Sequence, residues 1–385
     1  MSSENVAEMP TLTATAPLAM RGKGPIVPTK HWRMLDDGRV QCEMCPRYCR
    51  LKEGARGLCF VRARQDDAIV LTTYGRSGGF CIDPIEKKPL NHFLPGTPVL
   101  SFGTAGCNLA CNFCQNHDVS KSREMDRMQA EAQPETIAQA ALALGCRSVA
   151  FTYNDPVIFH EYSHDIAVAC REFGVKTVAV TAGYLTDRAR PDFFRGIDAA
   201  NVDLKAFTER FYRDVTKSQL QPVLDTLVYL VKETDVWVEI TNLLIPGEND
   251  SEAEIDAMTA WVVENLGPDV PMHFSAFHPD YRMLDKPRTP FGTLAMACRI
   301  ARRNGVRYAY AGNVHDLGRQ STHCHVCGTR VIGRDWYELS DWRLTDQGCC
   351  CGCGTQLAGV FDGRPGTWGR QRWPVDITNI TNNRV

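Results

Sequence analysis

The chain has 385 residues, and its 44% hydrophobic and 23% charged residues are typical of a globular protein with a sizeable core. Its formal net charge of −2 offers no basic face, so a nucleic-acid partner is not expected. The sequence contains no apolar run near the roughly 20 residues that span a bilayer, and residues 1–24 lack the pattern of a secretory signal. These features predict a cytoplasmic protein that does not use a membrane.

Cysteine is unusually frequent, with seventeen residues that lie mostly in three groups. In a large chain without a secretory signal, this usage indicates metal binding in a reducing compartment rather than disulfides. Cys146, Cys170 and Cys298 stand apart from the groups, within helical patterns, and we expect them to be ordinary buried thiols.

The first group follows a segment, residues 1–30, that has no hydrophobic periodicity and is expected to be disordered. Four cysteines then fall within 18 residues, and nearby glycines allow tight turns. Four thiolates can enclose one metal, which predicts a closed site that is structural or carries electrons. Zinc and an auxiliary iron–sulfur cluster remain alternatives, with metal-free thiols as a third. The four are Cys42, Cys45, Cys49 and Cys59.

The second group follows a short apolar segment, 99–102, that is expected to be the first strand of a barrel. Cys107, Cys111 and Cys114 have the spacing Cys-x3-Cys-x2-Cys, without a fourth Cys or His where a structural zinc would need one. Thiolates suit an iron–sulfur cluster, here with one open corner. This pattern resembles the radical S-adenosylmethionine (SAM) signature. The resemblance implies a [4Fe-4S] cluster that binds SAM and, after one-electron reduction, cleaves it to a 5′-deoxyadenosyl radical.

Strands and helices alternate through the next two hundred residues. Helices are predicted from Pro134 to Gly145, from about 158 to Gly174, over 223–230, from Ser251, and from Pro290 to Gly305. Strands are predicted at 148–152, 176–180, 201–205, 236–244, 272–276 and 306–310. This alternation indicates right-handed βαβ units. We therefore predict an α/β fold with a partial (β/α)6-type TIM barrel of the radical SAM kind.

Polar residues at the strand ends are the candidate SAM ligands, because barrel enzymes place functional groups there. Asp203 and Lys205 share one face of their strand, and their Asp-Leu-Lys resembles glycyl-radical-activating enzymes, where the lysine helps bind the SAM carboxylate. Asp155 fits a SAM contact and a helix N-cap equally well. The candidates are Asn154, Asp155, Thr181, Gly183, Asp203, Lys205, Thr241 and Asn242.

Two histidines near the sixth strand were compared as candidates for the substrate side of the site. His273 lies within the strand and is expected to be a hydrogen-bonded barrel residue, whereas His278 lies in the following loop. We therefore take His278 as the candidate that meets the substrate.

A third group of cysteines follows the barrel. Two Cys-x2-Cys-Gly knuckles flank a segment that is expected to form a hairpin around Trp336 and Tyr337, which is the pattern of a zinc ribbon. Repeating the same frame selects Cys350 and Cys353 over Cys349 and Cys351. The predicted zinc ligands are Cys324, Cys327, Cys350 and Cys353.

Several motifs together resemble the AmmeMemoRadiSam system radical SAM enzyme, a family related to the pyruvate formate-lyase activating enzymes. They are Cys-x2-Cys-Pro before the barrel, Asp-Pro-Ile-Glu-Lys-Lys-Pro-Leu at 83–90, Tyr-Asn-Asp-Pro at 153–156, Leu-Leu-Ile-Pro-Gly at 243–247, Phe-His-Pro-Asp-Tyr at 277–281 and Gly-Asn-Val-His at 312–315. The resemblance implies SAM, a [4Fe-4S] cluster and Memo-like and AMMECR-like partners. The chain has Val-Thr-Ala-Gly at 180–183 where activating enzymes have Asp-Thr-Asn-Gly.

The sequence thus predicts five regions: a disordered tail over 1–30, a cysteine-rich segment over 31–97, the barrel over 98–320, a zinc-ribbon-like module over 321–363 and a tail over 364–385. The leading hypothesis is a radical SAM enzyme that abstracts hydrogen from a small molecule or a protein, with a one-electron donor such as flavodoxin or ferredoxin. One alternative is an activating enzyme for a glycyl radical enzyme. The others are a zinc-ribbon module that binds RNA or protein on an inactive barrel, and a redox or scaffold protein that uses its metals structurally.

Overall fold

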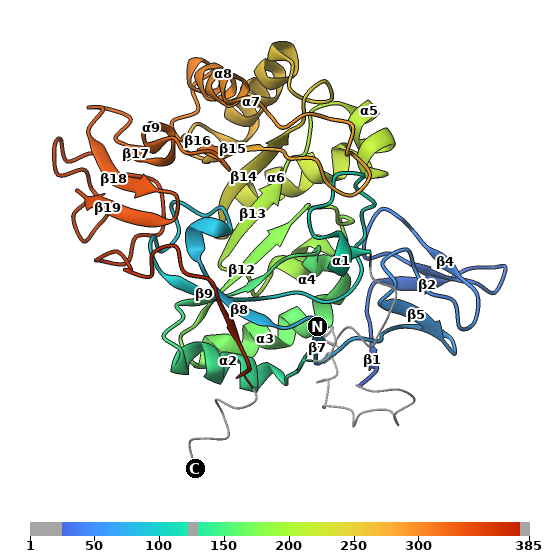
Figure 1. Cartoon of the computed structure of the whole chain (residues 1–385). Helices are drawn as coiled ribbons and strands as arrows, with labels where there is room; N and C mark the ends of the chain where they lie inside the picture. Colours follow the sequence, from blue (N-terminus) through green and yellow to red (C-terminus); the bar gives the residue numbers. More distant parts are fainter. Residues whose placement is uncertain (1–24, 122–129, 378–385) are drawn as a thin grey trace, which may run out of the picture.

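A curved nine-stranded sheet forms the centre of the molecule in the computed structural model, which describes residues 25–121 and 130–377 (Figure 1). Its strands are β8 (Phe80–Pro84), β9 (Pro98–Phe102), β11 (Ser148–Phe151), β12 (Lys176–Thr181), β13 (Ala199–Asp203), β14 (Trp237–Leu244), β15 (Met272–Ala276), β16 (Ala309–Gly312) and β20 (Trp373–Val375). The order is β16-β15-β14-β13-β12-β11-β9-β8-β20, and neighbours from β9 to β16 are parallel. The sheet ends at β16 and β20 without closing, so the predicted partial barrel is confirmed.

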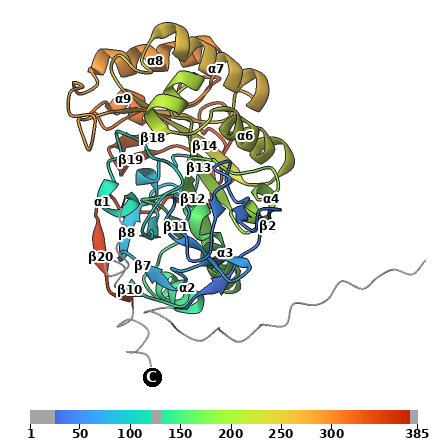
Figure 2. The same ribbon diagram turned by 90° about the vertical axis from the view of Figure 1, so that its right-hand side faces the viewer.

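The long helices lie on the outer side of this sheet (Figure 2). They begin and end within a few residues of the predicted positions: the Ser251 side chain accepts a hydrogen bond from the Glu254 amide, and Gly145 and Gly174 follow their helices with positive φ. The helical segments are η1 (Ile85–Lys87), α1 (His117–Ser120), α2 (Pro134–Ala143), η3 (Pro156–Phe159), α3 (His160–Glu172), α4 (Arg190–Phe194), α5 (Glu209–Phe211), η4 (Tyr212–Thr216), α6 (Gln221–Glu233), α7 (Glu252–Leu266), α8 (Phe291–Arg303) and α9 (Leu317–Gln320).

One end of the barrel is filled by the segment that precedes β9. Ile85, Leu90 and Phe93 pack against a ring of small apolar residues from β9, β11, β12 and β13. The buried carboxylate of Glu239 on β14 accepts hydrogen bonds from the amides of Asn91 and His92 at 3.0 and 2.7 Å. This plug closes the amino-terminal end of the strands and leaves the carboxyl-terminal end for the site.

Two cysteine-rich modules flank the barrel on opposite sides (Figure 1). The N-terminal one has small sheets β1-β6-β5 and β2-β3-β4, and β7 pairs with β10; the C-terminal one has the sheet β17-β18-β19. The strands are β1 (Val27–Pro28), β2 (Trp32–Met34), β3 (Val40–Cys42), β4 (Arg50–Leu51), β5 (Arg62–Gln65), β6 (Ala68–Leu71), β7 (Arg76–Ser77), β10 (Ala130–Glu131), β17 (Thr322–His323), β18 (Arg330–Asp335) and β19 (Glu338–Trp342). The expected hairpin is present, and Trp336 at its turn has a φ of 56°.

The edge of the central sheet differs from the sequence-based expectation. The strand β8 pairs antiparallel with β9, and β20 pairs antiparallel with β8. The sequence predicts only a tail over 364–385, but within 364–377 the strand β20 is part of the sheet. The expected disorder over 1–30 is wrong for its last residues, because β1 pairs antiparallel with β6. Residues 1–24 and 378–385 lie outside the described residues.

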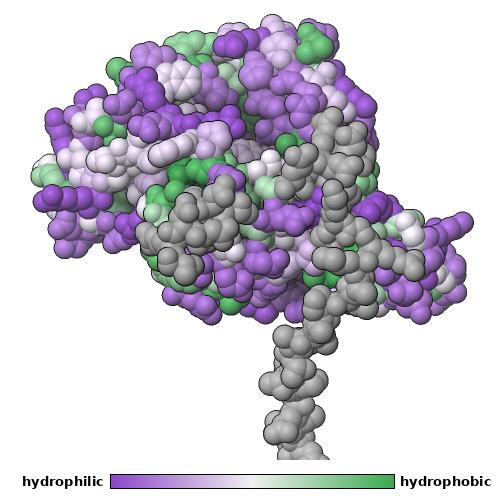
Figure 3. Space-filling view, turned by 60° about the horizontal axis from the view of Figure 1, so that its bottom comes forward, coloured by the Kyte–Doolittle hydropathy of each residue, from purple (hydrophilic) through white to green (hydrophobic). Residues whose placement is uncertain are grey.

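The face seen in Figure 3 is mostly hydrophilic, and apolar residues gather in only a few areas of it. Across residues 25–121 and 130–377, the helices are too short or too polar to cross a membrane.

Candidate active site and metal centres

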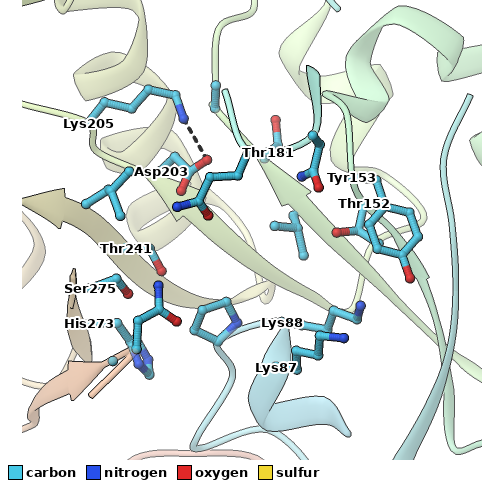
Figure 4. Close-up of a pocket in the computed structure, with 18 of the residues that line it drawn as sticks. Lys87, Lys88, Thr152, Tyr153, Thr181, Asp203, Lys205, Thr241, His273 and Ser275 are labelled. Carbon is cyan, nitrogen blue, oxygen red and sulfur yellow. Dashed lines mark hydrogen bonds and ion pairs between the residues drawn. The ribbon is translucent and has the colours of Figure 1, made fainter. Parts of the chain in front are cut away.

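A pocket of about 450 Å³ lies at the carboxyl ends of the barrel strands (Figure 4). The cysteine loop after β9 forms one side of it, and the strand ends form its floor. Among the residues that line it are Cys107, Cys111, Cys114, Asn154, Asp155, Thr181, Asp203, Lys205, Thr241, His273 and Ser275. The three thiols and most of the predicted SAM ligands therefore share one cavity.

The cysteine loop is held by main-chain contacts on both sides. The amides of Ala110 and Asn112 donate to the carbonyls of Thr216 and Val215. Gly106 has a φ of 86°, and a Cβ there would lie 2.0 Å from the Cys59 carbonyl oxygen, so only glycine fits this close approach. The loop thus holds its three thiols in place before any cofactor binds.

The three thiols of this loop are suited to bind an iron–sulfur cluster, which they would do in their deprotonated form. Burial raises the pKa of Cys111 to about 12, although the Lys205 ammonium partly opposes this effect. A buried neutral thiol is unreactive, and a bound metal would remove its proton. Three thiols beside a roomy cavity therefore fit a [4Fe-4S] cluster with an open corner.

Asp203 and Lys205 lie on one face of the chain, as the alternation predicts, and their side chains form an ion pair. The Lys205 ammonium lies 2.8 Å from an Asp203 carboxylate oxygen and 5.7 Å from the centre of the Phe113 ring (Figure 4). Burial disfavours its charge, but the Asp203 carboxylate and the Cys111 thiol more than offset that effect and raise the pKa of Lys205. A fixed cation thus lies beside the cysteine loop.

Asn154 and Asp155 line the pocket but are also used within the protein. The Asn154 amide donates to the Gly106 carbonyl at 2.8 Å and so supports the cysteine loop. Asp155 caps η3 by accepting from the Val157 amide, and it also accepts from the Thr181 hydroxyl and the Ala182 amide. The N-cap role considered from the sequence is therefore present, and the carboxylate lies at the edge of the pocket.

The remaining candidates divide between the pocket and its surroundings. Thr241 lines the pocket, and its buried hydroxyl has no hydrogen-bond partner among the described residues. Asn242 is not among the lining residues and donates to the Leu204 carbonyl, as expected from the alternation along β14. Gly183 also lies behind the pocket wall, where its carbonyl accepts from the Thr226 hydroxyl.

The two histidines are placed differently from the sequence-based choice. His278, the predicted substrate-side residue, is half-buried and does not line the pocket. His273 does line it, stacks on Tyr310 and contacts the Glu239 carboxylate at 2.6 Å. As expected, His273 has a buried partner, whereas the role of His278 on the substrate side stays a prediction.

Two lysines on the far wall were not identified from the sequence. Lys87 and Lys88 come from η1 and the residue after it, and they lie across the pocket from Lys205 (Figure 4). Both contact the buried carboxylate of Asp83, at 2.8 and 2.6 Å, and Tyr153 donates to the same carboxylate. Burial lowers the pKa of Lys88 to about 8, against the opposing effect of Asp83. The only local signal was the adjacent lysine pair in the 83–90 motif.

The C-terminal module supplies another part of the wall. Trp336 and Tyr337 at the turn of the β18–β19 hairpin line the pocket, as does Arg334 on β18. Arg334 is buried, donates to the Asn91 carbonyl at 2.6 Å and lies 3.8 Å from the Glu86 carboxylate. The predicted hairpin thus faces the same cavity as the cysteine loop.

The C-terminal cysteines form a tight group. The sulfurs of Cys324 and Cys353 lie 3.6 Å apart, and those of Cys327 and Cys350 lie 3.7 Å apart. Among the described residues, this is the only set of three or more Cys, His, Asp or Glu whose ligand atoms all lie within 4.8 Å of one another. Tetrahedral zinc with Zn–S bonds of about 2.3 Å requires sulfurs about 3.8 Å apart, so the set fits one such ion.

The four N-terminal cysteines surround a small cavity next to the barrel. Cys42 and Cys59 are buried, and Cys45 and Cys49 are partly buried. All four line this cavity together with Arg47 and Arg62. The predicted ligands therefore converge, with wider spacing than the C-terminal set.

Comparisons with known proteins agree with the three-cysteine site. The sequence model of the Radical SAM superfamily matches residues 102–258. The "Uncharacterized protein MJ0808" of Methanocaldococcus jannaschii is 39% identical over 303 residues, which cover 79% of this chain and 90% of that protein. The 4-hydroxyphenylacetate decarboxylase activating enzyme of Clostridioides difficile is 22% identical over 254 residues, covering 61% of this chain and 78% of that enzyme.

Among solved structures, a domain of pyruvate-formate lyase-activating enzyme from Bacteroides vulgatus aligns with a TM-score of 0.38 and 18% identity, over 43% of this chain and 99% of that domain. The matched span of the superfamily model contains the three cysteines and the Asp203–Lys205 pair. The chain therefore belongs to the radical SAM superfamily, as an enzyme of that type and a distant relative of the activating enzymes.

Proposed function

We propose that the protein binds SAM in the pocket, at a [4Fe-4S] cluster on Cys107, Cys111 and Cys114, and abstracts hydrogen from a substrate held against the far wall. The observation that carries this proposal is the placement of three thiols and a fixed ammonium around one cavity of about 450 Å³. When bound, the cluster supplies the electron that cleaves SAM, so the protein has to bind, orient and shield.

The charged side chain of Lys205 contributes to the binding of SAM. SAM carries a carboxylate and an ammonium group, and a charged hydrogen bond from the Lys205 side chain can hold the carboxylate. Asp203 keeps that ammonium charged and in place. The unpartnered hydroxyl of Thr241 and the edge of the Asp155 carboxylate are further polar contacts that a bound SAM can use.

The far wall supports a polar, anionic substrate. Lys87 and Lys88 together carry one more charge than the single Asp83 carboxylate between them neutralises. Trp336 and Tyr337 add flat apolar surfaces from the C-terminal module. This wall suits a small metabolite or a protein segment that carries an anionic group, with an aromatic or apolar part against the hairpin.

The motifs at 83–90 and 312–315 support a place in the AmmeMemoRadiSam family, with Memo-like and AMMECR-like proteins as partners. Both motifs contribute residues to the pocket. An activating enzyme for a glycyl radical enzyme is the second candidate, because a relative named 4-hydroxyphenylacetate decarboxylase activating enzyme matches 61% of the chain. In either case a one-electron donor of the flavodoxin or ferredoxin class would reduce the cluster.

The C-terminal set is proposed to bind one Zn²⁺ through Cys324, Cys327, Cys350 and Cys353. Two short sulfur–sulfur distances support it. The function of this ion is structural: it stabilises the hairpin that carries Trp336 and Tyr337 to the pocket.

An anaerobic assay of 5′-deoxyadenosine formation with SAM and a chemical reductant tests the proposal. The wild-type protein should form deoxyadenosine, and Cys111→Ala should reduce its formation to background while the barrel stays folded. Cys298→Ala is the matched control, because this thiol is buried in α8 away from the pocket. Full cleavage by the Cys111→Ala protein, or none by the iron-loaded wild type, would refute the assignment.

A further inference from the structure

We propose that Cys42, Cys45, Cys49 and Cys59 bind an iron–sulfur cluster and not a zinc ion. This inference goes beyond the proposed function, since it concerns a third metal centre whose presence does not depend on SAM cleavage. Three observations support it: the spacing of the sulfurs, the charged groups around them and the position of the site next to the Cys107–Cys114 loop.

The spacing of the sulfurs distinguishes this site from the C-terminal one. A single zinc ion brings all four sulfurs to about 3.8 Å from one another, as the C-terminal set nearly achieves. Within residues 25–121 and 130–377, no three of the N-terminal sulfurs meet even a 4.8 Å limit. They nevertheless surround one cavity, and a Cβ on Gly57 would lie 3.7 Å from the sulfurs of both Cys49 and Cys59. Each thiolate of an iron–sulfur cube binds a different iron, which requires this wider arrangement.

Two guanidinium groups at the cavity lack partners for an N–H group. Arg62 is 2% exposed; its Nε donates to the Ile158 carbonyl and its Nη2 to Glu161, but its Nη1 has no partner among the described residues. Arg47 donates through Nε to the Asn108 carbonyl, and its buried Nη2 is likewise unpartnered. Buried unpaired donors are costly. Sulfurs of a cluster in the cavity would satisfy both donors, since both arginines line it.

The site is in direct contact with the loop that carries the other three cysteines. The Cys59 carbonyl approaches Gly106 so closely that a Cβ would not fit, and Gly106 immediately precedes Cys107. Arg47 bonds to the carbonyl of Asn108, which also lines the N-terminal cavity. A redox-active cluster here would therefore neighbour the radical SAM cluster, whereas zinc has no redox chemistry.

Metal analysis of the wild-type full chain, purified without oxygen and reconstituted with iron and sulfide, is the first test. We expect about eight irons and one zinc per chain, because two cubes and one tetrahedral site are present. Four irons with two zincs would overturn the inference. Mössbauer spectra of the same sample would show two sites, of which only one changes when SAM is added.

A triple variant, Cys107→Ala with Cys111→Ala and Cys114→Ala, isolates the N-terminal site and needs no SAM chemistry. It should keep about four irons and give an S = 1/2 EPR signal on reduction, as a four-cysteine cube does. Adding Cys45→Ala should abolish the signal, whereas adding Cys146→Ala should not, because that thiol lies under α2 away from both sites. A folded triple variant that binds zinc or no metal in place of iron would overturn the inference, whether or not the wild type cleaves SAM.

Discussion

Two sets of four cysteines lie on opposite sides of one barrel, and their local chemistry differs. The C-terminal set is compact, Cys327 and Cys353 are exposed, and its ligands come from two knuckles of one module. The N-terminal set is spread around a cavity, and two arginines and the cysteine loop of the barrel close it. Two sites with the same number of cysteines can therefore favour different metals. The separation of the sulfurs and the hydrogen-bond donors around them decide which metal fits.

The two modules also differ in how they are joined to the barrel. Each uses a fully buried arginine: Arg62 pairs with Glu161 on α3 at 2.6 Å, whereas Arg334 lies 3.8 Å from Glu86. The first contact is a direct ion pair between two side chains, whereas Arg334 donates a short hydrogen bond to the neutral carbonyl of Asn91 and lies farther from a carboxylate. We therefore expect the N-terminal module to unfold with the barrel and the C-terminal one to separate more easily.

The largest effect is expected when zinc is removed from the C-terminal module. Structural zinc sites contribute apparent binding free energies on the order of 10 kcal/mol, so Cys353→Ser should unfold this module. Hydrogen exchange over 322–342 should rise, zinc content should fall by one per chain, and the iron content should not change.

The control for that experiment is Cys351→Ser, because Cys351 is exposed and outside the tight set. Deoxyadenosine formation should survive Cys353→Ser, while turnover of the natural substrate should not, since Trp336 and Tyr337 would leave the pocket wall. If the module keeps its protection without zinc, its stability comes from the apolar cluster it shares with Tyr308 and Tyr310 instead.

The next largest effect concerns the Arg62–Glu161 ion pair, which joins the N-terminal module to the barrel. Removing one partner of a buried ion pair typically costs about 3–5 kcal/mol, so Arg62→Met should lower the unfolding free energy of the whole barrel by this amount. Arg50→Met, an exposed residue of the same module, should change it by less than about 0.5 kcal/mol. Denaturant unfolding followed by circular dichroism measures both, and two separate transitions in Arg62→Met would contradict a module that unfolds with the barrel.

The stability of the contact between Glu86 and Arg334, which joins the C-terminal module to the barrel, should depend on pH. Burial, only partly offset by Arg334, raises the pKa of Glu86 to about 7 from its ordinary value of 4.5. The native state then holds the proton more tightly than the unfolded state, so this group's stability contribution is complete below pH 4.5 and is lost as the pH rises through 7. The loss amounts to about 3 kcal/mol.

Glu86→Gln removes this titration and keeps an oxygen for the Gly96 amide. Its unfolding free energy relative to the wild type should therefore rise between pH 4.5 and pH 8. The nearby His92, whose pKa burial lowers to about 4, titrates in both proteins, so the difference isolates Glu86. A pH-independent difference would show that Glu86 is ionised and firmly paired with Arg334.

Local patterns were sufficient for most of the barrel. Apolar strand segments, the Ser251 cap and the glycines after α2 and α3 are features of neighbouring residues, so the sequence predicted those elements within a few positions. The antiparallel strands β8 and β20 were missed, because β20 has three residues including Pro374 and its partner lies nearly 300 residues away.

The site divides in the same way. The cysteine motif and the Asp203–Lys205 alternation are local, and the structure brings these residues together. Lys87, Arg334 and Trp336 reach the pocket only through tertiary packing, which also leaves His278 outside it. The separation of the four N-terminal sulfurs is likewise a property of the fold. The spacing of these cysteines in the sequence therefore could not distinguish zinc from an iron–sulfur cluster.

The smallest of these effects concerns SAM binding at the three-cysteine site of the barrel. Lys205 is the cation closest in sequence and space to Asp203, and one charged hydrogen bond is worth about 1.5–3 kcal/mol. Lys205→Met should therefore weaken SAM binding to the reconstituted protein by about 10- to 100-fold. Lys217→Met is the matched control, because the Lys217 ammonium donates to the Asp214 carbonyl at the surface. Iron content should be equal in both variants, because neither lysine is a cluster ligand. If Lys205→Met binds SAM as tightly as the control does, the carboxylate of SAM is held by another cation of the pocket, and Lys87 and Lys88 become the next candidates.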